Sequence, residues 1–153
     1  YRVIPRTLIF LFSQDRVLLL KGAPGKHLWA NRYNGLGGHI ERGEDVLSAA
    51  RRELAEEAGI CVPNLRLCGT IMVDAGEETG IGIYVFRGEY TGDAPADSPD
   101  GSLEWIERHR LGEIDLIEDL PDLLSRLFSR ETEAPFSARS FYNEDGKIQI
   151  IFS

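Results

Sequence analysis

Three glutamates form an acidic cluster in the first half of the chain. Glu53, Glu56 and Glu57 stand at i, i+3 and i+4 in a run without Gly or Pro that Gly59 ends. At about 100° per residue they fall on one face of a helix. Two interpretations follow. The acids could be solvated surface residues, or they could bind Mg²⁺, which prefers carboxylate oxygens.

The residues around the cluster favour the metal. Gly38 is followed after five residues by Glu44, and after seven more by Arg52-Glu53-Leu54. Glu56-Glu57 and Gly59-Ile60 follow, each after one further residue. This pattern resembles the Nudix box, G-x5-E-x7-R-E-U-x-E-E-x-G-U with U aliphatic, and every specified position matches. A lone acid pair would be a weak signal, whereas a full match favours metal binding.

The resemblance to the Nudix family implies a fold, a reaction and a cofactor. The fold is an α/β (α+β) structure, an α/β/α sandwich with a mixed sheet between helices and the box as loop-helix-loop. The reaction is hydrolysis of a nucleoside diphosphate linked to another moiety, with Mg²⁺ or Mn²⁺ as cofactor. The alternative from another class is a nucleotide-sensing Nudix domain without turnover, but such domains usually have a broken box.

The same resemblance implies roles for the box residues. Glu53, Glu56 and Glu57 would hold the metal, joined by the backbone carbonyl of Gly37. Arg52 would pair with a box glutamate and orient it. A carboxylate near the attacking water can accept its proton; either Glu53 or Glu56 could do so, and we favour Glu56.

A further metal ligand is expected outside the box. In this family it often lies in the loop before a Trp-containing strand, here residues 103–106. Asp97, Asp100 and Glu104 all lie close to Trp105. Asp100 has the most familiar spacing, and the alternative is a solvated loop aspartate.

Residues 32–38 resemble the W-N-G-x-G-G run of the oxidised-purine triphosphatases, in which the Asn contacts the purine. An amide carries donors and acceptors, so Asn34 could bind a purine edge. The competing interpretation is a turn asparagine before Gly35. Gly38 closes the run; we expect it to allow the turn before the box helix and to lie at the substrate.

Glu118 and Asp119 fall where that subfamily places acids against the base. The alternative is that they are helix N-terminal acids. Ile117 stands where some relatives have Trp, which argues against stacking on the base. Lys21 and Lys26 could contact phosphates or be ordinary surface lysines.

These features predict hydrolysis of a (d)NTP, in particular an oxidised purine such as 8-oxo-dGTP, to the monophosphate and pyrophosphate. The alternative within the enzyme class is ADP-ribose or a dinucleoside polyphosphate. The sequence carries no motif resembling the NADH-pyrophosphatase or CoA-pyrophosphatase signatures.

Strands and two helices must position these residues. Apolar periodicity and turn residues predict the following elements. They are strands over 3–12 and 17–20, a loop over 22–38, a helix over 45–58, strands over 66–73 and 81–90, a loop over 92–101, a strand over 103–106, a helix over 117–130, and a final hairpin over 136–142 and 147–152.

Length and composition limit the class of protein. The 153 residues suit one domain over 1–153, and 42% hydrophobic with 27% charged residues is globular. A net charge of −8 without a basic run excludes tight binding to a nucleic acid polymer. No apolar stretch approaches the ~20 residues of a membrane helix. We expect a cytoplasmic monomer or homodimer with nucleotide substrates, no membrane partner, and Cys61 and Cys68 as buried thiols.

Overall fold

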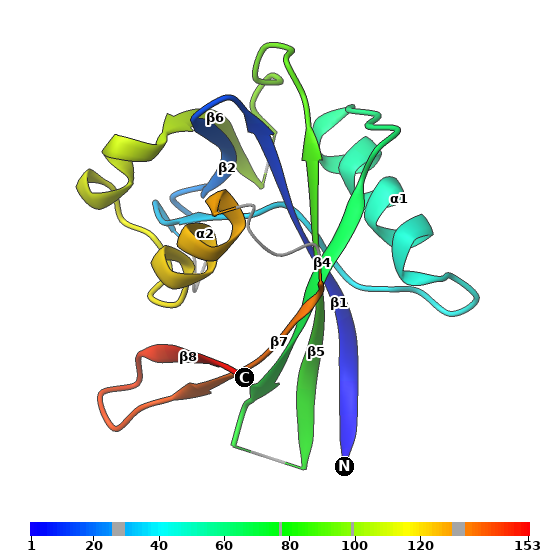
Figure 1. Ribbon diagram of the computed structural model, residues 1–153, viewed down its shortest axis with the longest axis vertical. Helices are drawn as coiled ribbons and strands as arrows, with labels where there is room; N and C mark the ends of the chain where they lie inside the picture. Colours follow the sequence, from blue (N-terminus) through cyan, green and yellow to red (C-terminus); the bar gives the residue numbers. More distant parts are fainter. Residues whose placement is uncertain (26–29, 77, 99, 130–133) are drawn as a thin grey trace.

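The computed structural model describes residues 1–25, 30–76, 78–98, 100–129 and 134–153. Within them, eight strands form one mixed sheet of order β3-β2-β1-β5-β4-β7-β8, with β6 paired to β2 (Figure 1). The pairs β1–β5 and β4–β7 are parallel and the other pairs are antiparallel. The strands are β1 (Arg2–Ser13), β2 (Arg16–Gly22), β3 (Tyr33–Asn34), β4 (Arg66–Asp74), β5 (Thr79–Glu89), β6 (Gly101–Glu107), β7 (Phe136–Tyr142) and β8 (Ile148–Phe152).

In the described ranges, two α-helices cover opposite faces of this sheet, α1 (Val46–Ala58) and α2 (Leu120–Phe128) (Figure 1). The second half of β1 is buried on both faces because a core lies on each side of the sheet, and its successive side chains enter the two cores alternately. Ile9 and Leu11 belong to the core under α1, with Ala50, Leu54 and Ala58 of that helix. The predicted α/β/α arrangement around a mixed sheet is therefore confirmed.

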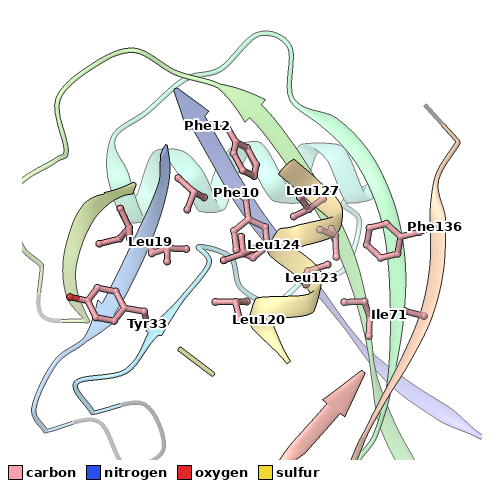
Figure 2. Packing of buried hydrophobic residues seen from close by; sticks show 14 of the residues in the cluster. Phe10, Phe12, Leu19, Tyr33, Ile71, Leu120, Leu123, Leu124, Leu127 and Phe136 are labelled. Carbon is pink, nitrogen blue, oxygen red and sulfur yellow. The ribbon is translucent and has the colours of Figure 1, made fainter. Parts of the chain in front are cut away.

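The other core lies under α2. Figure 2 shows the four leucines of that helix beside Phe10 and Phe12 of β1, with Ile71 and Phe136 from neighbouring strands. All four leucines are at most 4% exposed. They are Leu120, Leu123, Leu124 and Leu127.

The box helix α1 has the bounds that its capping residues predict. Asp45 is the N-cap, and its carboxylate accepts from the backbone N–H groups of Leu47 and Ser48, each at 2.9 Å. Gly59 ends the helix with φ 63°, a left-handed conformation in which glycine is least strained.

Several sequence predictions need correction. Residues 33–34 lie in the predicted loop but form β3, because they pair with β2. The predicted helix over 117–130 ends at Phe128 and begins only at Leu120. Its start is later because Leu116 forms a bridge with Tyr33 and the N–H of Ile117 donates to the Tyr33 carbonyl. A short 3-10 helix, η1 (Arg108–Glu113), was not predicted.

The two cysteines are free, but they are not both buried as expected. Cys61 is exposed because it alternates with Ile60 and Val62, which take the core side of the segment after α1. Cys68 is partly buried, and burial raises the pKa of its thiol. In the part of the chain that the structure describes, no helix is long and apolar enough to cross a membrane.

Candidate active site

The turn before the box helix is packed closely against β1. The N–H of Thr7 donates to the carbonyl of Gly38 at 2.8 Å, and that of Ile9 donates to Leu36 at 2.7 Å. Gly37 has φ 143°, and a Cβ there would lie 2.1 Å from the Thr7 carbonyl oxygen. This position therefore requires glycine, and the close approach sets where the box meets the sheet.

Arg52 forms hydrogen bonds with three glutamates of the box. It binds both carboxylate oxygens of Glu44, with Nε at 2.5 Å and Nη2 at 2.9 Å. Its Nη1 reaches Glu53 at 2.9 Å and Glu56 at 3.2 Å, and Nη2 also donates to the carbonyl of His39 at 3.0 Å. Hydrogen bonds from Arg52 and from the backbone of Glu41 lower the pKa of Glu44 to about 2.

Glu53 and Glu57 form a close carboxyl pair. Burial, then the charge of Glu53 and a hydrogen bond to it, raise the pKa of Glu57 to about 7, and the backbone of Gly37 hydrogen-bonds the same carboxyl. The Glu53 side chain is 13% exposed. A Cβ on Gly38 would lie 2.5 Å from the Glu53 carboxyl carbon. The missing side chain of Gly38 therefore makes room for this pair.

Asp100 is also near Glu57, since its charge contributes to the raised pKa of that carboxyl. Its backbone is anchored, because its carbonyl accepts from Ala23 at 3.1 Å and its N–H donates to the Ser98 hydroxyl at 3.3 Å. Asp97, an alternative outside ligand, and Asp100 are both exposed, but Asp100 lines the pocket beside Glu57 and Asp97 does not.

Glu104, another alternative outside ligand, faces Tyr33 instead. Burial, followed by a hydrogen bond to Glu104, raises the pKa of Tyr33 to about 12. The Glu104 Oε2 atom is buried and has no hydrogen-bond partner among the described residues.

The donor set of the box fits a hard divalent cation. Two half-buried carboxyls in contact repel when both are ionised, and a cation between them would offset that repulsion. Glu53 and Glu57 would hold such an ion, with Asp100 and the backbone of Gly37 close by. Among the described residues, no three acidic, His or Cys side chains form a finished metal cluster. Glu56, the third expected ligand of the box, contacts Arg52 as Glu53 does, but its side chain is 61% exposed.

A pocket of about 450 Å³ opens beside this pair. Glu57, Asp100, Gly37 and Gly38 contribute to its wall, and so do Asn34 and Asp119. The inner surface is mainly aliphatic and comes from β1, β4, β5, α2 and β8. Its aliphatic members include Leu8, Ile71, Val73, Ile81, Ile83, Leu120, Leu123 and Ile148.

Asn34 and Asp119 are brought together in this pocket although they are far apart in sequence. The Asn34 Oδ1 atom accepts from the N–H of Gly35 at 2.8 Å, which leaves its amide NH₂ group free of that bond. Asp119 occupies the N-cap position of α2, but its side chain makes no capping hydrogen bond. Its carboxyl accepts from the Ser140 hydroxyl at 3.3 Å, and burial raises its pKa.

Other predicted substrate residues lie differently. Glu118 pairs with Arg32 at 3.0 Å, and Arg32 lines the pocket. Lys21 does not appear among the described lining residues; its Nζ atom lies 5.6 Å from the centre of the Tyr33 ring. Lys26 lies outside the described residues.

Comparison with known proteins identifies the family of the chain. The NUDIX domain model matches residues 3–128 of the chain. The chain is a member of the Nudix family. Its relatives include proteins named oxidized purine nucleoside triphosphate hydrolase from two vertebrates. The Danio rerio protein is 34% identical over 102 residues, 66% of this chain and 64% of that protein. The Mus musculus protein is 30% identical over 114 residues, 74% of this chain and 72% of that protein.

The fold of this Nudix chain is also found in solved structures. The MutT protein from Bacillus halodurans has a TM-score of 0.77 at 23% identity, covering 98% of this chain and 97% of that one. This likeness shows the fold.

Sequence reasoning did not identify two residues at this Nudix site. Arg6 lines the pocket, and its guanidinium donates to the ring of His39 in the turn before the box helix. Arg6 lies in a strand without any motif, so pairing of β1 with residues 36–40 is what brings it to the site.

Proposed function

We propose that this protein hydrolyses a purine nucleoside triphosphate, in particular an oxidised purine (d)NTP such as 8-oxo-dGTP, to the monophosphate and pyrophosphate with Mg²⁺ or Mn²⁺. The observation that carries the proposal is that one pocket holds both kinds of group that this reaction needs. Glu57 and Asp100 on its wall are the carboxylates that would bind the metal. Asn34 and Asp119 on the same wall are the polar groups that would bind the base. The relatives named oxidized purine nucleoside triphosphate hydrolase support this choice of substrate.

The residues take the following roles in this proposal. Glu53 and Glu57 hold the metal with the Gly37 carbonyl and Asp100. A bound ion supplies charge neutralisation at the phosphate oxygens and lowers the pKa of a bound water. Glu56 accepts the proton of the attacking water, for which its solvent-exposed carboxylate suits it.

At the base end, Asn34 donates from its amide to the purine edge. Asp119, whose pKa burial raises, can donate as well as accept when protonated. The aliphatic wall contacts the ring faces. Arg32 is held by Glu118 and by the carbonyl of Leu116, at 3.0 and 2.9 Å, which stiffens the rim of the pocket beside Asn34.

A substrate panel tests the proposal. The protein is incubated with Mg²⁺ and canonical dNTPs, 8-oxo-dGTP, ADP-ribose and a diadenosine polyphosphate, and both nucleotide product and pyrophosphate or phosphate are recorded. We expect preference for the oxidised purine with release of pyrophosphate. Turnover of ADP-ribose alone would contradict the assignment of the base site. Absence of turnover with every substrate in the panel would favour a nucleotide-sensing domain.

Glu53→Gln tests the metal assignment in the same assay. We expect it to lower turnover by at least about a hundredfold with little change in melting temperature. Glu113→Gln is the matched control, because its side chain is 67% exposed and lies on η1. Equal turnover of Glu53→Gln and wild type would contradict the metal site.

A further inference from the structure

Arg6 and Arg32 both line the pocket, and they differ in what neutralises them. Arg32 lies 3.4 Å from a carboxylate oxygen of Asp115 and 3.0 Å from one of Glu118. Arg6 has no carboxylate partner among the described residues. Its Nε and Nη2 atoms lie 3.3 and 3.0 Å from Nε2 of His39.

The His39 imidazole does not neutralise Arg6. A guanidinium group can only donate, so Nε2 of His39 is the acceptor in this contact. An imidazole brings no negative charge, so Arg6 keeps its positive charge. His39 is itself held in place, because its carbonyl accepts from Nη2 of Arg52 at 3.0 Å.

Strand register places Arg6 on the pocket face of the sheet. Arg6 of β1 is directly paired with Ile83 of β5, and Ile83 with Ile71 of β4. Directly paired residues point to the same face, and both isoleucines line the pocket. Arg6 is half-buried, and its guanidinium contacts the His39 ring.

Arg6 lies at the metal end of the pocket rather than at the base end. It forms an antiparallel bridge with His39, while Ile9 bridges Leu36. His39 directly follows Gly38, which contacts the Glu53 carboxyl, whereas Asn34 is five residues earlier in the chain. An extended segment of that length spans about 15 Å. Arg6 is therefore close to where the box carboxylates would meet phosphates.

We propose that Arg6 binds the phosphate groups that leave as pyrophosphate, and that His39 is a positioning residue for Arg6. This inference rests on the proposed function. A triphosphate brings several negative charges into a pocket that already carries Glu57 and Asp100. A planar guanidinium without a carboxylate partner suits two phosphate oxygens at once. The imidazole of His39 orients the guanidinium without bringing a negative charge that would compete with phosphate.

Product inhibition distinguishes the two ends of the substrate. Wild type, Arg6→Gln and Arg6→Lys are compared in the Mg²⁺ assay, with inorganic pyrophosphate and the nucleoside monophosphate as inhibitors. Arg2→Gln is the control, since it removes the same charge from an exposed position on the same strand.

We expect Arg6→Gln to raise KM and the inhibition constant of pyrophosphate about tenfold to a hundredfold, with kcat changed much less. Inhibition by the monophosphate should not change. Arg6→Lys should recover part of the loss, and Arg2→Gln should match wild type. Unchanged inhibition by pyrophosphate, or equal weakening of both inhibitors, would overturn the proposal.

His39→Ala tests the positioning role. It should weaken pyrophosphate inhibition in the wild-type background and add nothing in the Arg6→Gln background, which shows that it acts through Arg6. Additive losses in the double variant would contradict that role.

Calorimetry separates this inference from the proposed function. If wild type turns over none of the nucleotides, the proposed function fails, and binding of magnesium pyrophosphate is measured directly in wild type and Arg6→Gln. Loss of binding in the variant, with an unchanged circular dichroism spectrum, would support the phosphate role of Arg6. Absence of binding by wild type, or equal binding by both proteins, would overturn it.

Discussion

Replacing Glu57 with Gln should stabilise the metal-free protein at alkaline pH. In the folded chain the pKa of this carboxyl is raised from 4.5 to about 7, chiefly by burial and then by Glu53. The folded state therefore holds the proton more tightly than the unfolded state. The contribution of Glu57 to stability is fully present below about pH 4.5, is lost as the pH rises through about 7, and is absent above it.

The two pKa values set the size of the effect. Their difference corresponds to about 3 kcal/mol, which is an upper bound because solvent screens a carboxyl that is only partly buried. We expect about 1–2 kcal/mol. The Gln amide has the shape of the protonated carboxyl and can donate to Glu53 in its place. For a chain of this size the gain corresponds to a rise in Tm of about 3–6 °C.

Thermal unfolding followed by circular dichroism measures this gain. Wild type and Glu57→Gln are melted in EDTA at about pH 5 and about pH 8, and again with Mg²⁺. The variant should be more stable at the higher pH and much closer to wild type at the lower one. Mg²⁺ should raise the Tm of wild type but not that of Glu57→Gln. Glu56→Gln, at a largely exposed position, is the control without this pH dependence. A difference between Glu57→Gln and wild type that does not change with pH in EDTA would refute the reasoning.

Three substitutions test other parts of the site. Arg52→Lys loses the paired hydrogen bonds to Glu44, and we expect Mg²⁺ affinity measured by calorimetry to fall about tenfold to a hundredfold; wild-type affinity would show that orientation by Arg52 is unimportant. Gly38→Ala places a Cβ 2.5 Å from the Glu53 carboxyl, so it should lower Mg²⁺-dependent turnover while the far-ultraviolet circular dichroism spectrum stays that of wild type. Asn34→Ala should raise KM for purine triphosphates more than for pyrimidine triphosphates, and an equal rise for both would argue against contact with the base.

The α-helix of the box could be predicted closely from the sequence. Its start and end depend on residues within one turn, Asp45 as acceptor for two N–H groups and Gly59 in the left-handed conformation. The helical period then places three glutamates along one side. By contrast, the start of α2 was predicted three residues early. Ile117 fits a helical pattern, but its N–H donates to the carbonyl of Tyr33, 84 positions earlier in the chain.

Sequence alone determined the box, the acidic residue types of the proposed metal site and the order of most elements, because short-range periodicity and capping decide them. The pairs Glu53/Glu57 and Arg52/Glu56 are each four residues apart, so helix geometry alone brings them together. The tertiary structure decided that Glu57 lines the pocket, because it packs the helix against Gly37 and Gly38. It also brings Arg6 to His39 through the pairing of β1 with the box turn. Such contacts follow from strand register between distant segments, and the residues next to each partner in the sequence do not indicate this register.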